Sequence, residues 1–125
     1  NKNKKFLNKF DFKSFKRKKS LFAMTAHIIY SHYDKINTAT HSKIVIKGVI
    51  RKGIKFKGIL MSDDISMKAL KYDLKKNVTK SLKAGCNLVL HCNGKMKEME
   101  IVAKTVPKVD SFILKKTSQF YNFLM

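Results

Sequence analysis

The stretch Gly58-Ile-Leu-Met-Ser-Asp-Asp-Ile-Ser-Met67 decides the fold of this chain, because an apolar run ends there in two adjacent carboxylates. The run predicts a buried strand, and burying two acids without a task is costly. In parallel α/β folds catalytic groups gather at the carboxyl ends of the strands, so Asp63 and Asp64 are the first candidates for chemistry. The alternative is that Asp64 or Ser66 caps the helix that follows. That alternative leaves Asp63 unexplained.

Two other apolar runs predict strands, over residues 21–26 and 87–92, besides the one over 56–61. All three runs are mostly continuous rather than alternating, as expected of parallel strands that are covered on both faces. Each strand is followed by a helical pattern, and a last one completes the chain. These patterns run from Thr40 or Ser42 to Gly53, from Leu74 to Gly85, from Lys95 to Val106 and from Val109 to Phe123. The sequence therefore predicts an α/β fold with the order βαβαβα and right-handed crossovers.

The chain has 125 residues, the length of one domain, and no apolar run approaches the roughly 20 residues that span a bilayer. We therefore expect a soluble protein. Residues 1–20 are predicted to be an irregular, lysine-rich segment. Four phenylalanines in that segment are spaced to anchor it on the core: Phe6, Phe10, Phe12 and Phe15.

The formal net charge is +20, which normally points to nucleic acid or to an anionic membrane surface. Only Arg17 and Arg51 are arginines, and the other basic residues are lysines. Lysine lacks the bidentate fork that specific readout of bases or phosphates favours. We therefore interpret the charge as a solvated surface and keep a nucleic-acid function as the second interpretation.

Cys86 and Cys92 flank the third predicted strand, which places them roughly 20 Å apart at about 3.3 Å per residue. This separation is far beyond disulfide reach. Two unpaired thiols without C-x-x-C spacing suit a reducing cytoplasm and argue against a zinc site. We expect both cysteines to be packing residues.

Polar side chains follow each predicted strand. His27 follows the first, Ser62 and Asp63 follow the second, and His91 and Asn93 follow the third. Because the carboxyl ends of parallel strands face one way, these groups predict one concave site. For each histidine taken alone, a satisfied core position is the alternative.

Four ordered motifs resemble one known family. They are Met24-Thr-Ala-His-Ile-Ile-Tyr30, Ala39-Thr40-x-Ser42, Phe56-x-Gly-Ile-x-x-Ser-Asp-Asp-x-Ser-Met67 and Ala84-Gly-Cys-Asn-Leu-Val-Leu-His-Cys-Asn-Gly94. Together they resemble the C-terminal portion of the catalytic barrel in bacterial β-N-acetylhexosaminidases of glycoside hydrolase family three, the NagZ type. The chain departs from that pattern at Thr38, where the family usually has Pro, and at Asn87, where Asp commonly follows Gly-Cys.

The resemblance implies a (β/α)8 TIM barrel, of which this chain supplies about the last three βα units and a C-terminal helix. Residues 1–125 are then the C-terminal part of one barrel domain, and we expect the chain to be cut from a longer protein. Three strands cannot close a barrel of eight. We therefore expect the chain alone to be neither a stable barrel nor an active enzyme.

In the family the acid after Ser or Thr of this motif is the nucleophile, which implies that role for Asp63. It forms a covalent glycosyl-enzyme that is hydrolysed with net retention. The resemblance also implies that His27 and Met67 line the substrate site. The family's acid/base, a histidine paired with an aspartate, and its sugar-holding Lys-His-Phe-Pro-Gly-His-Gly motif do not occur in this sequence. No residue here is assigned the acid/base role, and the family needs no metal or organic cofactor.

The function implied by the resemblance is that of a cytoplasmic β-N-acetylglucosaminidase of peptidoglycan recycling. It removes terminal N-acetylglucosamine from muropeptide or chitooligosaccharide-like substrates. Its expected partners are this amino-sugar substrate and the missing N-terminal half of the barrel, with no specific nucleic acid and no membrane. Two alternatives remain: a small lysine-rich nucleic-acid-binding protein, and an inactive gene remnant.

Overall fold

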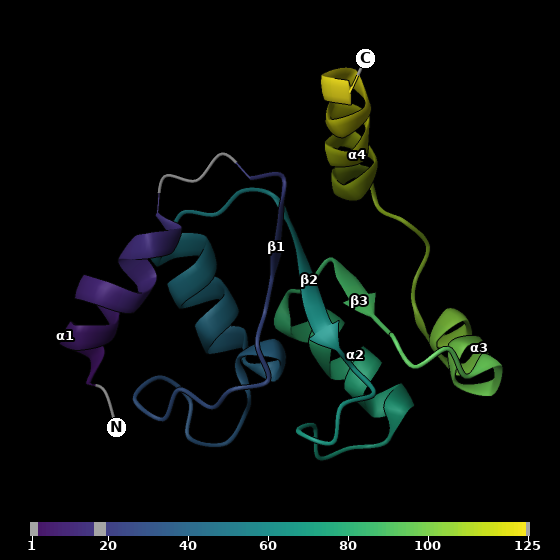
Figure 1. The fold of residues 1–125 in the computed structure, drawn as a ribbon, viewed down its shortest axis with the longest axis horizontal. Coiled ribbons are helices and arrows are strands. Elements are labelled where there is room, and N and C mark those ends of the chain that lie inside the picture. The colour runs from purple at the N-terminus through teal and green to yellow at the C-terminus, as the bar shows by residue number, and fades with distance from the viewer. Residues whose placement is uncertain (1–2, 17–19, 125) are drawn as a thin grey trace.

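The structure is a computed structural model that describes residues 3–16 and 20–124. Figure 1 shows a small parallel sheet with helices around it. The elements, in chain order, are α1 (Lys4–Phe6), η1 (Leu7–Asp11), η2 (Phe12–Phe15), β1 (Phe22–Met24), η3 (Ala39–His41), η4 (Val45–Gly53), β2 (Ile59–Asp64), α2 (Leu74–Ala84), β3 (Leu88–Leu90), α3 (Met96–Thr105) and α4 (Ser111–Leu124). The described helices include none that is both long and apolar enough to cross a bilayer.

The three strands pair in the order β1-β2-β3, and both pairings are parallel. The predicted α/β class is therefore confirmed. The pairing of β2 with β3 has an irregularity between Met61 and Asp64, which bears on the site described below. That these strands belong to a closed barrel stays a prediction.

The second strand begins later than predicted and runs through both acids, so Asp63 and Asp64 end β2 instead of following it. The reason lies in the turn before the strand, where Lys55 has φ of 64°. Gly58 then passes so close to β1 that an added Cβ would lie 2.3 Å from the Leu21 carbonyl oxygen. Glycine is required at this contact. Regular pairing starts one residue later, at Ile59.

The helix boundaries follow the predicted start and stop residues closely. Ser42 caps the helical segment that leads into η4, because its Oγ accepts from the Val45 N–H at 3.2 Å. The turns of η4 are wider than α-helical, as in the bond from Ile54 N–H to the Val49 carbonyl. At the end of α2, Gly85 has φ of 121°, a conformation that favours glycine.

One predicted cap is wrong. Neither Asp64 nor Ser66 caps the next helix, because α2 begins only at Leu74, ten residues after Asp64. Its N-cap is Asp73, whose side chain accepts from the Lys76 N–H at 2.9 Å. The carboxylate of Asp64 is used within the site instead.

The predicted irregular N-terminal segment is also wrong for the residues described. Residues 4–15 form consecutive helical turns, which Asn3 opens by accepting from the Phe6 N–H. Leu7 and Phe12 bury one side of these turns against Ala39, Val45 and Val49. Of the four predicted anchors only Phe12 is buried, because Phe6, Phe10 and Phe15 are 40%, 51% and 64% exposed. The rest of the predicted segment, residues 1–2 and 17–19, lies outside the described residues.

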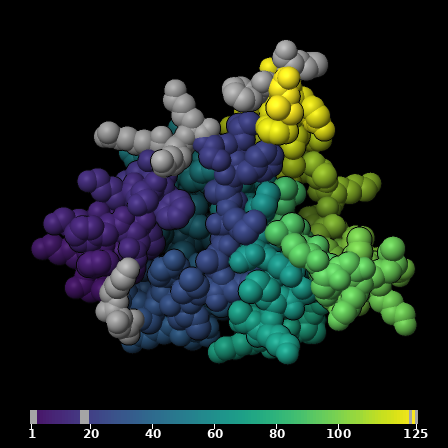
Figure 2. Space-filling view, in the orientation of Figure 1, coloured from purple at the N-terminus to yellow at the C-terminus, as the bar shows by residue number. Residues whose placement is uncertain are grey.

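The core lies between the sheet and its helices. Leu60 of β2 packs against Ile46 of η4 and against Ala84 and Cys86 at the end of α2. Cys86 is therefore a packing residue, as predicted, whereas Cys92 is exposed and is not. Near the start of the sheet, α4 contacts β1 through Phe120, whose ring centroid lies 5.6 Å from that of Phe22 (Figures 1 and 2).

Candidate active site

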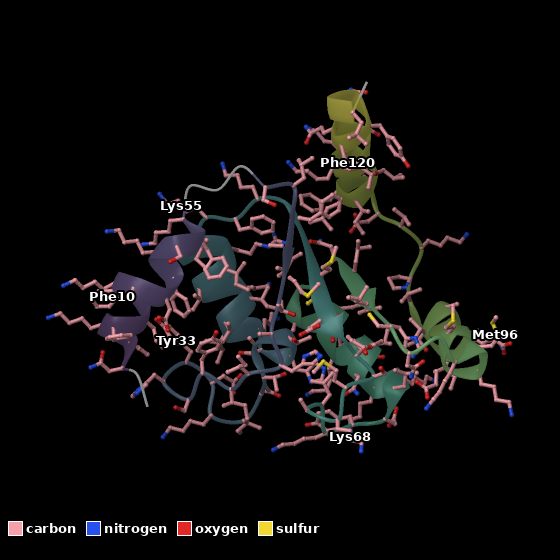
Figure 3. The ribbon with its side chains drawn as sticks, viewed as in Figure 1. Phe10, Tyr33, Lys55, Lys68, Met96 and Phe120 are labelled. Carbon is pink, nitrogen blue, oxygen red and sulfur yellow. The ribbon has the colours of Figure 1, made fainter. Side chains whose placement is uncertain are left out.

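The candidate site is at the carboxyl end of the sheet, opposite the end that α4 contacts (Figure 1). Figure 3 labels Lys68 in the loop that leaves β2, which marks this end. Leu60 packs against the helices. The register of β2 with β3 shifts between Met61 and Asp64, so the segment that carries Ser62 and Asp63 is irregular. The two neighbouring acids have different hydrogen-bond partners.

Ser62 and Asp64 connect β2 to the backbone of β3. The Ser62 Oγ accepts from the Leu90 N–H at 3.0 Å, and the Asp64 Oδ1 accepts from the Cys92 N–H at 3.3 Å. Cys92 lies two residues beyond the end of β3, so the second bond continues the contact past that strand. The two bonds compensate for the irregular pairing in this region, since side chains take the place of backbone acceptors.

The carboxylate of Asp64 is fully engaged in the fold. Besides Cys92, it accepts from the backbone N–H of Ser66 at 3.0 Å and from the Ser66 hydroxyl at 2.8 Å. Partial burial raises the pKa of Asp64, but these hydrogen bonds and the nearby His91 outweigh it and hold the pKa below its ordinary value. Asp64 is therefore an ionised structural carboxylate.

The carboxylate of Asp63 is the less engaged of the two. Its Oδ1 accepts one hydrogen bond, from the backbone N–H of Asp64 at 2.8 Å. Its Oδ2 accepts none from the described residues, and the side chain is half-buried. An oriented carboxylate with one oxygen that lacks a partner among the described residues can act as a nucleophile.

His27 lies against the end of β2, as predicted for a group of the same site. Its Nε2 lies 2.8 Å from the Asp64 carbonyl oxygen, and its Nδ1 lies 2.8 Å from the Thr40 Oγ1. Both ring nitrogens are therefore occupied by the protein. The sequence around Thr40 indicates only a helix start. Its contact with His27 could be anticipated only because the two residues lie in two of the family-like motifs, over residues 24–30 and 39–42.

Met67 lies in the turn after β2. Its backbone N–H donates to the Asp64 carbonyl at 3.2 Å, so this oxygen accepts from both Met67 and His27. The Met67 side chain is 45% exposed. The structure thus leaves this side chain accessible near Asp63, and its contact with a substrate stays a prediction.

His91 and Asn93 bond to Glu98 of α3 and not to Asp63, although His91 lies close enough to Asp64 to lower the pKa of that carboxyl. The His91 side chain is 6% exposed and bonds through Nε2 to the Glu98 carboxylate of α3 at 3.0 Å. Asn93 bonds to the same carboxylate. The bond from His91, together with that from Asn93, lowers the pKa of Glu98 to about 2. Nothing in the sequence pattern marked Glu98 as their partner.

Two other histidines give no substitute for the absent acid/base. His32 is exposed in the loop after β1. His41 is buried, and this burial, with the charge of Lys80, lowers its pKa to about 4, so that it is neutral at pH 7. Neither is hydrogen-bonded to Asp63 in the described part of the chain.

One apolar cavity lies elsewhere in the described structure. It has a volume of about 440 Å³ and lies between β1, η4 and the N-terminal turns, with an apolar lining that includes Phe12, Phe22, Val49 and Phe56. Asp63 does not line it. A polar sugar does not fit such a lining, so this cavity is not a candidate for the substrate site. Among residues 3–16 and 20–124, no three potential ligand side chains gather as a metal site.

The chain is similar to known proteins over most of its length. The family model described as the glycosyl hydrolase family 3 N terminal domain matches residues 3–117. The β-hexosaminidase of Vibrio cholerae is 35% identical over 107 residues, which are 81% of this chain and 32% of the relative. The chain thus spans about a third of the length of that relative.

Two solved structures share the fold at similar identity. Native NagZ from Neisseria gonorrhoeae superposes with a TM-score of 0.69 at 28% identity, covering 86% of this chain and 30% of that one. The β-N-acetylglucosaminidase from Thermotoga maritima superposes with a TM-score of 0.62 at 28% identity, covering 86% and 26%. The chain belongs to glycosyl hydrolase family 3, as part of its N-terminal domain.

Proposed function

We propose that this chain supplies the catalytic nucleophile, Asp63, of a retaining β-N-acetylhexosaminidase. The observation that carries the proposal is the contrast between the two acids at the end of β2. Asp64 is held by Ser66 and Cys92, whereas the Asp63 Oδ2 is free to attack. Two of the relatives described above are named as a β-hexosaminidase and a β-N-acetylglucosaminidase, which supports an amino-sugar substrate.

The proposed reaction has two displacements. The Asp63 Oδ2 attacks the anomeric carbon, and the bond from that carbon to the glycosidic oxygen breaks. The leaving oxygen takes a proton from an acid that lies outside this chain. Water then attacks the same carbon and gives a proton back to the group that served as the acid, the bond to Asp63 breaks, and the product retains its anomeric configuration. None of these steps uses a metal or an organic cofactor.

The proposed substrate is a glycan with a terminal N-acetylglucosamine, in particular a peptidoglycan muropeptide fragment. Recycling of such fragments places the enzyme in the cytoplasm. The three strands here are proposed to be the last three of a (β/α)8 barrel, whose other part supplies the acid/base and the groups that hold the sugar. That other part is the proposed protein partner of this chain.

The test is a fusion protein in which this chain replaces the matched segment of the Vibrio cholerae β-hexosaminidase. We expect it to hydrolyse p-nitrophenyl N-acetyl-β-glucosaminide with retention. A fluorinated N-acetylglucosaminide should trap the covalent intermediate, and peptide mapping should find the label on Asp63. A fusion that folds but shows no turnover, while the parent enzyme is active, would overturn the proposal. Label on Asp64 would overturn the assignment of the nucleophile.

A further inference from the structure

His27 connects the end of β1 to the acids of β2. A carbonyl oxygen only accepts hydrogen bonds, so the contact with Asp64 fixes a proton on the His27 Nε2. The other nitrogen, Nδ1, faces the Thr40 hydroxyl at 2.8 Å. His27 therefore has a single tautomer when neutral, with Nε2 as the donor.

The hydroxyl network behind His27 holds the ring in place. Thr40 Oγ1 lies 2.9 Å from the Thr25 Oγ1 and 3.2 Å from the Ala26 carbonyl, and both threonines are buried. If His27 is neutral, Thr40 donates to its Nδ1. If His27 is protonated, Nδ1 donates to Thr40, which then donates to Ala26. The network is satisfied in either state, so the bond to Asp64 does not depend on the charge of the ring.

The contact continues from Asp64 to Asp63. His27 and Met67 hold the carbonyl of Asp64, while Ser66 and Cys92 hold its carboxylate. With residue 64 fixed on both sides, its N–H is directed at the Asp63 Oδ1 at 2.8 Å. That bond orients the Asp63 carboxylate and leaves Oδ2 for attack.

We infer that His27 is a positioning residue, which orients the Asp63 carboxylate through the backbone of Asp64 and does not bind the sugar. The inference rests on the proposed function for its catalytic consequence. It corrects the role that the resemblance implies for His27, because both ring nitrogens already have protein partners. A group displaced by about 1 Å can lose 10²-fold in rate, so such positioning matters for catalysis.

A matched pair of variants separates the two ring contacts. In His27→Gln the amide nitrogen takes the place of Nε2 and can still donate to Asp64. In His27→Asn the amide nitrogen takes the place of Nδ1, reaches Thr40, and leaves the Asp64 carbonyl without this donor. His32→Asn changes an exposed loop histidine and is the control.

The first readout is hydrogen exchange of the Asp64 amide, whose proton is bonded to the Asp63 carboxylate. It is measured residue by residue in the folded fusion protein. We expect about tenfold faster exchange at Asp64 in His27→Asn, near wild-type exchange in His27→Gln, and unchanged exchange at the buried Val78 of α2. Unchanged exchange at Asp64 in His27→Asn would overturn the inference.

The second readout is steady-state kinetics of the fusion protein. We expect His27→Asn to lower kcat by about 10–100-fold with little change in KM, and His27→Gln to restore most of the loss. A raised KM at unchanged kcat would show that His27 binds the sugar, and would also overturn the inference. If the folded fusion itself shows no turnover, the proposed function fails, and the exchange measurement still decides the role of His27.

Discussion

The Asp63 Oδ1 lies 2.8 Å from the backbone nitrogen of Asp64, so one acid of the pair orients the other. The two acids are neighbours in the sequence but differ in their contacts. The Asp64 carboxylate accepts hydrogen bonds from Ser66 and from the Cys92 N–H. Asp63 keeps one carboxylate oxygen without a partner among the described residues.

This difference predicts different outcomes for the two amide substitutions in the fusion protein. Asp63→Asn removes the proposed nucleophile and should lower kcat by about 10³-fold or more, with the unfolding temperature unchanged. Asp64→Asn keeps the shape but weakens the bonds from Ser66 and Cys92. It should lower kcat by about 10–100-fold and also lower the unfolding temperature. Equal kinetic effects of the two substitutions would argue against different roles for the two acids.

The outline of the fold could be predicted because it depends on local signals. Apolar runs marked the three strands, Gly85 marked the end of α2, and Pro107 lies just beyond α3. The N-terminal turns could not be predicted, because their stability comes from Leu7 and Phe12 packing against η4 and not from helix propensity.

The partners within the site were equally hidden from the sequence. His27 and Asp64 are 37 positions apart, and their contact depends on the parallel pairing of β1 with β2. His91 resembled a site residue because it follows β3. Its ring instead bonds to the Glu98 carboxylate of α3. A strand end predicts where a polar residue lies, but only the pairing predicts what it contacts.

A second prediction concerns Asn87, where the family commonly has Asp. The Asn87 Oδ1 accepts from Arg51 Nη2 at 2.8 Å and from the Leu60 N–H at 2.9 Å. Both neighbours are donors and the guanidinium is charged, so Asn87→Asp turns the bond from Arg51 into an ion pair and makes the bond from the Leu60 N–H charge-assisted. We expect about 1 kcal/mol of stabilisation in urea unfolding of the fusion protein.

The matched control for Asn87→Asp is Asn93→Asp. Asn93 donates to the Glu98 carboxylate, so an acid there replaces a hydrogen bond with a repulsion. We expect it to destabilise the protein. If both substitutions shift the urea midpoint in the same direction, the argument from the local donors is wrong.

A third prediction is acid sensitivity at Asp34. Burial raises the pKa of this carboxyl, but bonds from the N–H groups of Asn37 and Ile36 and from the Ser42 hydroxyl lower it to about 2, from an ordinary 3.8. A lowered folded-state pKa stabilises the fold above the unfolded-state value, and this contribution is lost as the pH falls from 3.8 toward 2.

Asp34→Asn tests this dependence. We expect the variant to lose about 1 kcal/mol of stability at pH 6, and the difference from wild type to shrink toward pH 2.5. Denaturant midpoints of the fusion protein at several pH values measure it. Glu100→Gln is the control, because its exposed pair with Lys104 at 3.8 Å should contribute little at any pH. A gap between wild type and Asp34→Asn that is constant with pH would contradict the argument.

A fourth prediction concerns the net charge of +20. If the lysines form a solvated surface, the chain should bind DNA or RNA weakly, without sequence preference, and lose this binding at moderate salt through counterion competition. Fluorescence anisotropy at rising salt measures the effect. Tight, sequence-selective binding at physiological salt would favour the nucleic-acid interpretation over the glycosidase.

The last prediction is that the 125-residue chain without further strands is less cooperative than the fusion protein and has no glycosidase activity. In the described structure β1 and β3 each pair on one side only, so backbone groups on the outer edges lack strand partners. Met24, on the face of the sheet away from the helices, is 51% exposed. Activity should fail for a separate reason, because loss of an acid/base costs roughly 10²–10⁴-fold.

Circular dichroism melts, sedimentation at several concentrations and the p-nitrophenyl assay test both parts of this last prediction. We expect a broad melt, concentration-dependent association and no turnover. A sharp, monomeric melt together with turnover would show that the chain is complete as it stands and that one of its own groups supplies the proton.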